Sequence, residues 1–354
     1  MKSLLKKLYN TNSLDNDELL YLLDNMNVEY QELLFYYANN TRIRNYGKKV
    51  YIRGLVEFSS YCKNTCKYCG IRCENKKADR YRMELEEIIK CCNEGNKLDY
   101  KTFVLQSGED AYYTDDLLVE IVLKIKSCFP NSAVTLSIGE KSYLTYKKLF
   151  NAGVDRYLLR HETASKELYK ELHPRMSFEN RMRCLNDLKD IGYQVGAGFI
   201  VGLPNQTNEV LVKDLLYLKK LEPEMVGIGP LIIHPDTPLR NFKCGSLSKT
   251  FTCLALTRLL LPDVLLPATT ALNVVDPNGW GKALKVGANV IMLNLSPGYL
   301  RKKYELYKGK AEVVDEAIKY FEEVKEIINK AGYEMDMSRG DHKRWKRKEG
   351  ICCE

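Results

Sequence analysis

The 354-residue chain has no hydrophobic run of the roughly 20 residues that a membrane-spanning helix requires. Residues 1–6 are amphipathic rather than continuously apolar, so they do not predict a signal peptide. The chain also lacks repeats at the periods of solenoid proteins, and it lacks low-complexity linkers. We therefore expect a cytoplasmic protein that has no membrane partner.

The chain also lacks the second pair of closely spaced cysteines that a structural zinc site would need after the cysteine-rich loop at residues 62–73. In total there are 12 cysteines, and most are scattered along the sequence. Scattered cysteines in a chain of this length argue for a reducing compartment rather than a disulfide framework.

Charge does not point to nucleic acid as a partner. The formal net charge of +8 is diffuse, apart from a basic run at residues 339–348. Such a run is usually a solvated chain end. An anionic substrate or an acidic partner protein is the better functional explanation, so we expect no nucleic-acid partner.

Three cysteines dominate the chemistry of the sequence: Cys62, Cys66 and Cys69. A [4Fe–4S] cluster is normally held by four thiolates, so three leave one iron open to bind another molecule. Cys73 follows four residues later and would complete a spacing close to that of ferredoxins. Ferredoxins are far shorter than this chain, so we predict one open, reactive cluster with Cys73 outside it.

From residue 48 onward, short β-rich runs alternate with amphipathic helices, which predicts a (β/α)8 TIM-type barrel in residues 48–310. The predicted strands are 52–58, 102–105, 133–138, 155–160, 195–201, 225–230, 265–269 and 288–293. A helical extension is expected in residues 1–47, with Ser13 as a helix N-cap, and a helix with a basic tail in residues 311–354. A doubly wound open sheet is the alternative, but eight regular units favour closure.

In such barrels the active site lies at the carboxyl ends of the strands. After the second strand, Glu109 and nearby backbone carbonyls are placed to receive an ammonium group. On the third strand, Thr135 and Ser137 are two residues apart and should point to the same side.

The fourth strand ends with unusually polar residues. By the same two-residue period, Arg160 and Glu162 should face the barrel mouth, while His161 faces outward. An arginine there could clamp a carboxylate, a glutamate could accept ribose hydroxyls, and Arg181 on the next helix could reach the same anion. A simple salt bridge at the strand end is the alternative. On the fifth strand, Gly198 and its small neighbours would let an adenine ring lie flat against the backbone.

The cysteine spacing, with an aromatic residue before the third cysteine, resembles the signature of the radical S-adenosylmethionine (SAM) enzymes. Over residues 48–310 the chain also resembles the HydE family of radical SAM maturases for the [FeFe]-hydrogenase active site. The resemblance is carried by several runs in the expected order, namely residues 53–59, 62–70, 80–83, 104–110, 157–164, 177–181, 196–207, 225–239 and 267–270.

This resemblance implies a set of roles. It implies that Cys62, Cys66 and Cys69 hold the cluster, and that Gln106, Ser107, Thr135, Ser137, Arg160, Glu162, Arg181 and Tyr304 surround SAM. It implies that Thr269, Thr270 and Met292 line the substrate cavity. It implies formation of a 5′-deoxyadenosyl radical that attacks a cysteine-bound Fe(CO)2(CN) complex, or another organometallic or small-molecule substrate, at sulfur. The implied partners are a tyrosine-lyase maturase, a GTPase maturase and a reductant such as ferredoxin or flavodoxin.

Two other functions stay open on sequence alone. One is a lysine mutase similar to methylornithine synthase, which shares the barrel but must hold a free amino acid. The other is a non-catalytic iron–sulfur scaffold, which would not cleave SAM. Sulfur insertion of the biotin synthase type is less favoured, because no ligand set for a second cluster is found. No cysteine occurs between Cys253 and Cys352, and the Cys352–Cys353 pair lacks suitable spacing.

Overall fold

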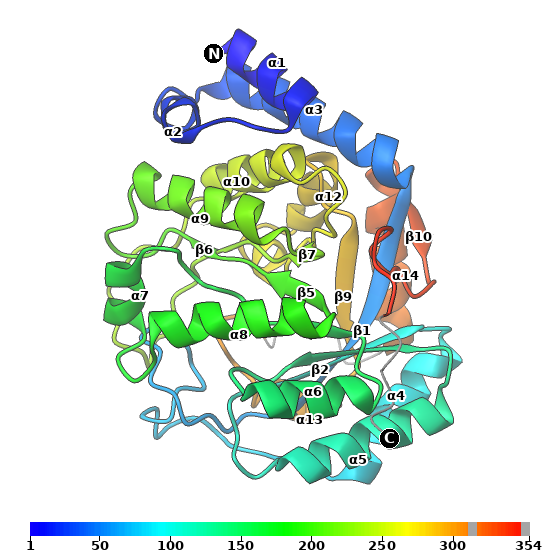
Figure 1. Cartoon of the computed structure of the whole chain (residues 1–354). Helices are drawn as coiled ribbons and strands as arrows, with labels where there is room; N and C mark the ends of the chain where they lie inside the picture. The colour runs from blue at the N-terminus through cyan, green and yellow to red at the C-terminus, as the bar shows by residue number, and fades with distance from the viewer. Residues whose placement is uncertain (311–316, 348–354) are drawn as a thin grey trace.

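The computed structural model describes residues 1–310 and 317–347 of the chain. A parallel sheet forms its centre, and neighbouring strands follow one another in chain order. These strands are β1 (Lys49–Ser59), β2 (Thr102–Ser107), β3 (Ala133–Ser137), β4 (Arg156–Leu158), β5 (Gln194–Ala197), β7 (Met225–Val226) and β9 (Val290–Asn294). Because β9 pairs with β1, the sheet curls into a barrel, which confirms the predicted fold class (Figure 1).

The seventh predicted strand, at residues 265–269, is the weakest part of the barrel. It joins its neighbours only through single bridges, from Leu265 to Met225 and from Pro267 to Val290. A proline lacks the backbone N–H that a ladder needs, which explains why no regular strand forms there. The two bridges still connect β7 to β9 and so complete the barrel.

The fifth and sixth predicted strands are each interrupted. Their second halves form a separate pair, β6 (Ile200–Val201) with β8 (Gly229–Pro230). The interruption falls at Gly198, whose φ is +144°. A Cβ atom there would lie 2.0 Å from the carbonyl oxygen of Gly227, so these two segments of the barrel approach each other too closely to admit a side chain at Gly198.

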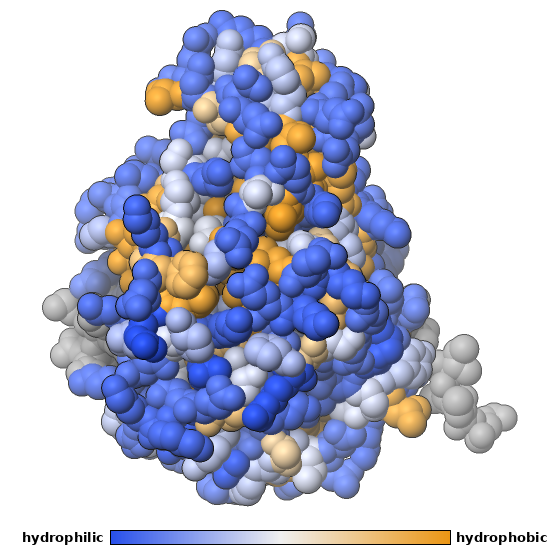
Figure 2. Space-filling model, turned by 90° about the vertical axis from the view of Figure 1, so that its left-hand side faces the viewer, coloured by the Kyte–Doolittle hydropathy of each residue, from blue (hydrophilic) through white to orange (hydrophobic). Residues whose placement is uncertain are grey.

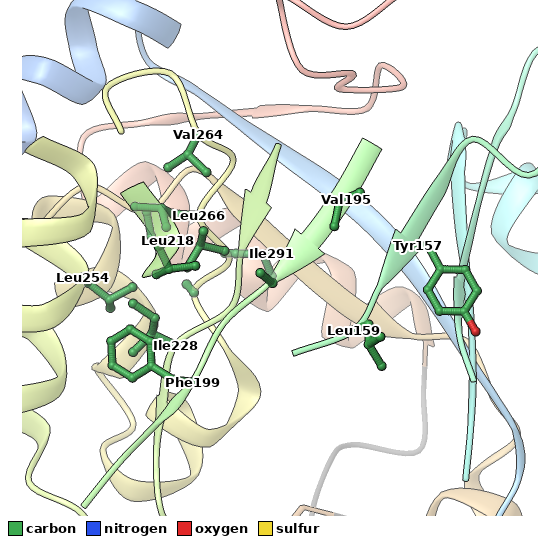
Figure 3. Close-up of a cluster of buried hydrophobic side chains, with 14 of the residues drawn as sticks. Tyr157, Leu159, Val195, Phe199, Leu218, Ile228, Leu254, Val264, Leu266 and Ile291 are labelled. Carbon is green, nitrogen blue, oxygen red and sulfur yellow. The ribbon is translucent and has the colours of Figure 1, made fainter. Parts of the chain in front are cut away.

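Helices cover the outside of the barrel (Figure 1). They are α4 (Leu85–Lys97), α5 (Asp115–Cys128), α6 (Tyr143–Asn151), α7 (Lys166–Leu172), α8 (Phe178–Ile191), α9 (Asn208–Leu221), α10 (Leu247–Leu260), α11 (Thr270–Val275), α12 (Gly279–Lys285) and α13 (Gly298–Arg301). Apolar side chains such as Leu218, Leu254, Phe199 and Ile228 are fully buried where α9 and α10 pack on the strands (Figure 3). Among the residues described, no helix is both long and apolar enough to cross a bilayer.

The first 46 residues form three helices, α1 (Lys2–Thr11), α2 (Asn16–Asp24) and α3 (Val28–Tyr46). They pack over α9 and α10 (Figure 1). The predicted N-cap at Ser13 is wrong, because Asp15 caps α2. Its carboxylate accepts a hydrogen bond from the backbone N–H of Glu18, and the Glu18 side chain accepts one from the Asp15 backbone in return. This reciprocal capping box is stronger than a lone hydroxyl cap.

The C-terminal residues 334–347, which we call the C-terminal strap, follow α14 (Ala317–Lys330) and cross the amino-terminal end of the barrel. The strap begins with β10 (Glu334–Asp336), which pairs in parallel with the start of β1. Asp341 then accepts hydrogen bonds from Gln194 and Arg156. The expectation of a solvated basic end is therefore wrong for part of the described run, since Gly340 and His342 are buried, whereas Lys343, Arg344 and Lys346 are exposed.

Removing the Asp341 carboxylate is expected to destabilise the fold by about 2 kcal/mol, because the buried Arg156 guanidinium keeps its hydrogen bonds to Thr102 and the Arg339 carbonyl but loses the carboxylate that balances its charge. Burial alone would raise the pKa of Asp341, but the pairing with Arg156 and hydrogen bonds from Arg339 and Gln194 hold that pKa well below its usual range. The stabilisation is therefore complete at neutral pH. It is lost as the pH falls below about 4, the pKa of an unfolded aspartate.

Urea unfolding of Asp341→Ala at pH 7 and near pH 3 measures this effect. The difference in the free energy of unfolding between the variant and the wild type should be smaller at the lower pH. Asp116→Ala is the matched control, because Asp116 pairs with Lys148 on the surface with 87% of its side chain exposed. Such pairs contribute little. Equal unfolding midpoints for the two variants at pH 7 would contradict the role of the strap.

Candidate active site

A cavity of about 360 Å³ opens at the carboxyl ends of the strands. It brings together most of the side chains that the sequence predicts for the site. The predicted residues that line it are Cys62, Cys66, Cys69, Gln106, Ser107, Glu109, Ser137, Arg160, Glu162, Arg181, Thr269, Thr270, Met292 and Tyr304. Thr135 and Gly198 are not among the lining residues.

The cysteine loop leaves the end of β1 and folds over the cavity. Gly70 is needed where the loop meets the last barrel segment, because a Cβ atom there would lie 2.1 Å from the carbonyl oxygen of Glu305. The Gly70 N–H donates to the Leu306 carbonyl at 2.8 Å. Arg80 holds the far side of the loop by donating to the carbonyls of Ile71 and Arg72 at 2.7 and 2.8 Å. The loop is therefore fixed before any ligand binds.

The three thiols suit a cationic cluster and are poorly suited to stand as free thiolates. Burial, together with the neighbouring cysteines, raises the pKa of Cys66 well above its usual value, and burial raises that of Cys69 to about 12. The sulfur of Cys62 accepts backbone N–H groups of Asn64 and Glu109 at 3.5 and 3.4 Å. Iron ions would supply the positive charge that such buried sulfurs need to ionise.

Cys73 lies beside this loop, where its backbone N–H donates to the carbonyl of Asn64 at 2.9 Å, but it lies outside the cavity. Its sulfur lies 3.8 Å from a guanidinium nitrogen of Arg175. Arg175 itself has 62% of its side chain exposed. The placement agrees with three ligands inside the cavity, and the exclusion of Cys73 from the cluster stays a prediction that iron analysis can test.

Arg160 and Glu162 both face the cavity, as the two-residue period predicts. They form an ion pair with each other, in which Nη2 of Arg160 lies 2.8 Å from Oε2 of Glu162. Glu162 has a φ of +66°, in the left-handed region that only a few non-glycine residues adopt. Such strain persists where the surroundings fix the backbone. Here the Glu162 N–H donates to Gly198 and its carbonyl accepts from Ile200.

His161 faces away from the cavity, as predicted. Its ring is fully buried among Phe199, Tyr217 and Asp214. Its Nδ1 accepts the backbone N–H of Gly198 at 3.3 Å, so its role is to hold the end of β4 against β5.

Arg181 extends from the first turn of α8 toward the same region. It donates to the carboxylate of Glu140 at 2.7 Å and to the carbonyl of Arg160 at 2.8 Å. Although burial alone would lower it, the neighbouring Tyr169 and Glu140 keep the pKa of Arg181 raised. Glu140, which the sequence did not single out, is therefore the group that orients this cation.

Glycines of the sixth strand, rather than Gly198, provide the flat wall of the cavity. Gly227 and Gly229 both line it. A Cβ atom at Gly227 would meet Arg160 Cδ at 3.6 Å and the carbonyl oxygen of Ala197 at 4.0 Å, which are ordinary contact distances, so no atom crowds this glycine. The side of Gly198 is instead filled by the backbone of Gly227, which makes Gly198 a packing residue.

Deeper in the barrel, Thr135 is fully buried below Ser137, and its hydroxyl has no hydrogen-bond partner among the described residues. Thr269, Thr270 and Met292 lie along the cavity wall. The hydroxyl of Thr269 is 3.4 Å from the carbonyl oxygen of Ile228. Two threonines beside apolar neighbours provide a small number of polar contacts in a mostly apolar space, as ligand pockets commonly do.

A buried ion pair at the cavity was missed in the sequence. Lys310 lines the cavity and pairs with Glu57, which is 1% exposed. The other carboxylate oxygen of Glu57 accepts from Asn294 at 2.8 Å. Glu57 lies two residues before the end of β1 and could have been found by the strand-end rule. Lys310 comes from a loop with no periodic signal.

The comparisons with known proteins agree with this geometry. Residues 56–218 match the family model of the Radical SAM superfamily, which includes the three cysteines and the Arg160–Glu162 pair. Together with the barrel and its open three-cysteine loop, this match defines the protein as a radical SAM enzyme, whose class binds a [4Fe–4S] cluster and SAM.

One relative is much more similar to this chain than two members of the same superfamily need to be. The chain is 50% identical to the [FeFe] hydrogenase maturase subunit HydE of Thermotoga maritima, over 79% of this chain and 80% of that protein. The chain therefore belongs to the HydE family. It is also 32% identical to 3-methylornithine synthase of Methanosarcina acetivorans, over 78% of this chain and 79% of that protein.

Solved structures agree on the fold. The crystal structure of methylornithine synthase (PylB) superposes with a TM-score of 0.83 at 28% identity, covering 94% of this chain and 97% of that one. HydG, a maturase of the [FeFe]-hydrogenase, gives a TM-score of 0.79 at 20% identity, covering 95% and 75%. The HydG likeness concerns the fold alone.

Proposed function

We propose that this chain is a maturase of the [FeFe]-hydrogenase active site that cleaves SAM reductively to a 5′-deoxyadenosyl radical. The observation that carries the proposal is the 50% identity to the Thermotoga maritima maturase across 79% of the chain. The identity to 3-methylornithine synthase is only 32% over a similar length. The substrate we propose is a cysteine-bound Fe(CO)2(CN) complex, and the cavity of about 360 Å³ is large enough for a ligand of that size.

In this proposal Cys62, Cys66 and Cys69 hold the single [4Fe–4S] cluster, which when bound and reduced supplies the electron that breaks a sulfur–carbon bond of SAM. The chain itself binds and orients SAM and the substrate, and it shields them from water. The raised pKa of each thiol means that the cysteines are poor thiolates until iron arrives, which couples loop ionisation to cluster assembly.

The upper, polar part of the cavity would bind SAM through a set of side chains from several strand ends. These are Gln106, Ser107, Glu109, Ser137, Arg160, Glu162, Arg181 and Tyr304. Arg160 and Glu162 would exchange their mutual ion pair for ligand contacts, with the guanidinium on the carboxylate and the carboxylate on the ribose hydroxyls. The uncrowded side of Gly227 suits the flat face of an adenine ring.

The lower part of the cavity would hold the substrate against Thr269, Thr270 and Met292. Enclosure by the barrel excludes water, which strengthens polar contacts and protects a radical from side reactions. We further propose that a tyrosine-lyase maturase supplies the substrate, that a GTPase maturase acts with it, and that a ferredoxin or flavodoxin is the reductant. A reducing cytoplasm suits this function, and all ten described cysteines are free thiols.

Incubating the reduced, reconstituted protein with SAM tests the proposal at two levels. Formation of 5′-deoxyadenosine identifies an active enzyme, whereas an intact cluster without that product would indicate a scaffold. Restoration of hydrogenase activity in a maturation mixture that lacks its HydE component identifies the pathway. Conversion of lysine to methylornithine would assign the chain to the other family instead.

The double variant Thr269→Val and Thr270→Val is expected to lower hydrogenase maturation at least tenfold while 5′-deoxyadenosine still forms. Valine matches threonine in shape, so only the two hydroxyls are lost. Thr269 is the N-cap of α11 but makes no side-chain capping bond, so the fold should tolerate the change. The matched control is Thr257→Val, a fully buried threonine on α10 whose hydroxyl has no hydrogen-bond partner in the part of the chain that the structure describes. Unchanged maturation in the double variant would remove both threonines from the substrate site.

A further inference from the structure

Positive charge is concentrated at the cluster loop. Residues 61–82 contain seven lysines and arginines but only two acidic residues. The basic C-terminal run lies at the opposite end of the barrel. In its described part, Arg339 and Arg347 pair with Asp155 and Arg344 pairs with Asp263, whereas Lys343 and Lys346 are exposed and form no ion pair with a described residue. The cysteine loop is therefore one of two basic segments, and it is the one whose cysteines line the cavity.

Several of these loop cations reach into solvent. The side chains of Lys63 and Lys77 are 66% and 78% exposed, and each makes one ion pair, with Glu109 and Asp236 respectively. Lys76 is exposed and has no ion pair within the described chain. The loop lies at the lower left of Figure 1, and Figure 2 shows that side of the molecule, whose lower half is largely hydrophilic.

In one part of this surface the side chains are held in a fixed arrangement by their contacts with one another. The guanidinium of Arg82 lies between two exposed tyrosine rings, 3.8 Å from the centre of Tyr61 and 4.8 Å from that of Tyr112. Asp110 fixes the same guanidinium through two hydrogen bonds of 2.7 and 2.9 Å, and Ser59 donates to that carboxylate. Tyrosine and arginine side chains that are held rigid before contact are typical anchors of protein interfaces.

The position of this anchor suggests what it binds. Tyr61 is the chain neighbour of Cys62, and its carbonyl oxygen packs against Gly108, where an added Cβ atom would approach it to 2.2 Å. The inner face of the loop lines the enclosed cavity. A protein that delivers an electron to the cluster must therefore approach from the outer face, where Tyr61, Arg82 and Tyr112 are exposed.

We propose that the outer surface of residues 61–82, together with Tyr112, is the docking site for a small acidic protein that carries one electron. This inference rests on the proposed function, because the cluster must be reduced before SAM is cleaved. One electron leaves the carrier and enters the cluster, so the carrier is oxidised as the cluster is reduced, and no bond is made or broken. The basic loop would steer the acidic carrier, and the tyrosine–arginine stack would fix its position.

The test compares a protein donor with a small one. The double variant Lys76→Glu and Lys77→Glu reverses two exposed charges on the loop, and Tyr112→Ala removes one ring of the stack. Stopped-flow absorbance follows reduction of the reconstituted cluster, by reduced flavodoxin in one arm and by dithionite in the other. The second-order rate with flavodoxin should fall about tenfold at low ionic strength in the charge variant, with a weaker salt dependence. Tyr112→Ala should lower that rate about fivefold, and the rate with dithionite should stay within twofold.

The matched control is Lys147→Glu with Lys148→Glu on α6. This pair also combines one exposed lysine, Lys147, that has no ion pair with a described residue and one, Lys148, that pairs with Asp116. Equal slowing in the control, equal slowing with dithionite, or no slowing with flavodoxin would each overturn the proposal. So would a loop variant that blocks transfer from a partner maturase while flavodoxin reduction stays normal. The absorbance reports reduction of the cluster itself. Failure of SAM cleavage would therefore refute the proposed function but would leave the conclusion about the docking site unchanged.

Discussion

Cys66→Ala is expected to lose the iron–sulfur cluster and all SAM cleavage, whereas Cys73→Ala is expected to keep both. Cys66 lies in the cavity with Cys62 and Cys69, and the burial of all three thiols favours binding of a cationic cluster over free thiolates. With two ligands left, the cluster would have two irons without protein ligands, and we expect it not to persist. Cys73 instead faces Arg175 near the surface.

Iron content after anaerobic reconstitution measures this result, together with the absorbance of the cluster. The wild-type chain and Cys73→Ala should each hold about four irons per chain, and Cys66→Ala should hold none that is specifically bound. About eight irons per wild-type chain would contradict the prediction of a single cluster. The terminal Cys352–Cys353 pair, which that prediction sets aside, lies outside the described residues.

Cys184→Ala serves as the control for loss of a buried thiol. Cys184 is fully buried on α8 and does not line the cavity. Its loss should leave iron content unchanged. If Cys73→Ala lost the cluster while Cys62→Ala kept it, the ligand assignment itself would be wrong.

The strand ends of the barrel were predictable because two simple periodicities act together. A parallel barrel places the carboxyl ends of its strands at one mouth, and side chains alternate along each strand. Those rules placed Arg160 and Glu162 in the cavity and turned His161 away from it, as the structure confirms. Applying these two rules required only the residues of each strand and no knowledge of distant contacts.

Contacts between distant segments could not be read in the same way. Lys310 meets Glu57 across 253 positions of the chain, and no local pattern relates them. The choice between Gly198 and Gly227 depended on which strand leaves space beside its glycine, which is a property of packing. The packing of the C-terminal strap could not be read locally, because its arginines pair with aspartates more than 70 residues away, such as Asp263.

Glu162→Gly is expected to weaken SAM binding about 10- to 100-fold while the cluster still assembles. Loss of a hydrogen-bonding partner for polar groups in a closed site costs about 1.5–3 kcal/mol, which corresponds to that range. Glycine is the informative substitution because Glu162 has a φ of +66°. Glycine adopts this conformation without strain, so the backbone should keep its course and only the carboxylate is lost.

Glu222→Gly is a closely matched control. Glu222 is the C-cap of α9 with a φ of +46°, is exposed, and does not line the cavity. The same substitution there relieves the same kind of backbone strain without touching the site. Equilibrium binding of SAM to the reconstituted protein, with iron content measured on the same samples, separates the two roles. Weaker SAM binding with full iron in Glu162→Gly, and unchanged binding in Glu222→Gly, would assign the carboxylate to the ligand. An equal loss of iron in Glu162→Gly would instead make Glu162 a structural support of the cysteine loop, because its ion pair with Arg160 lies within the same cavity as Cys66.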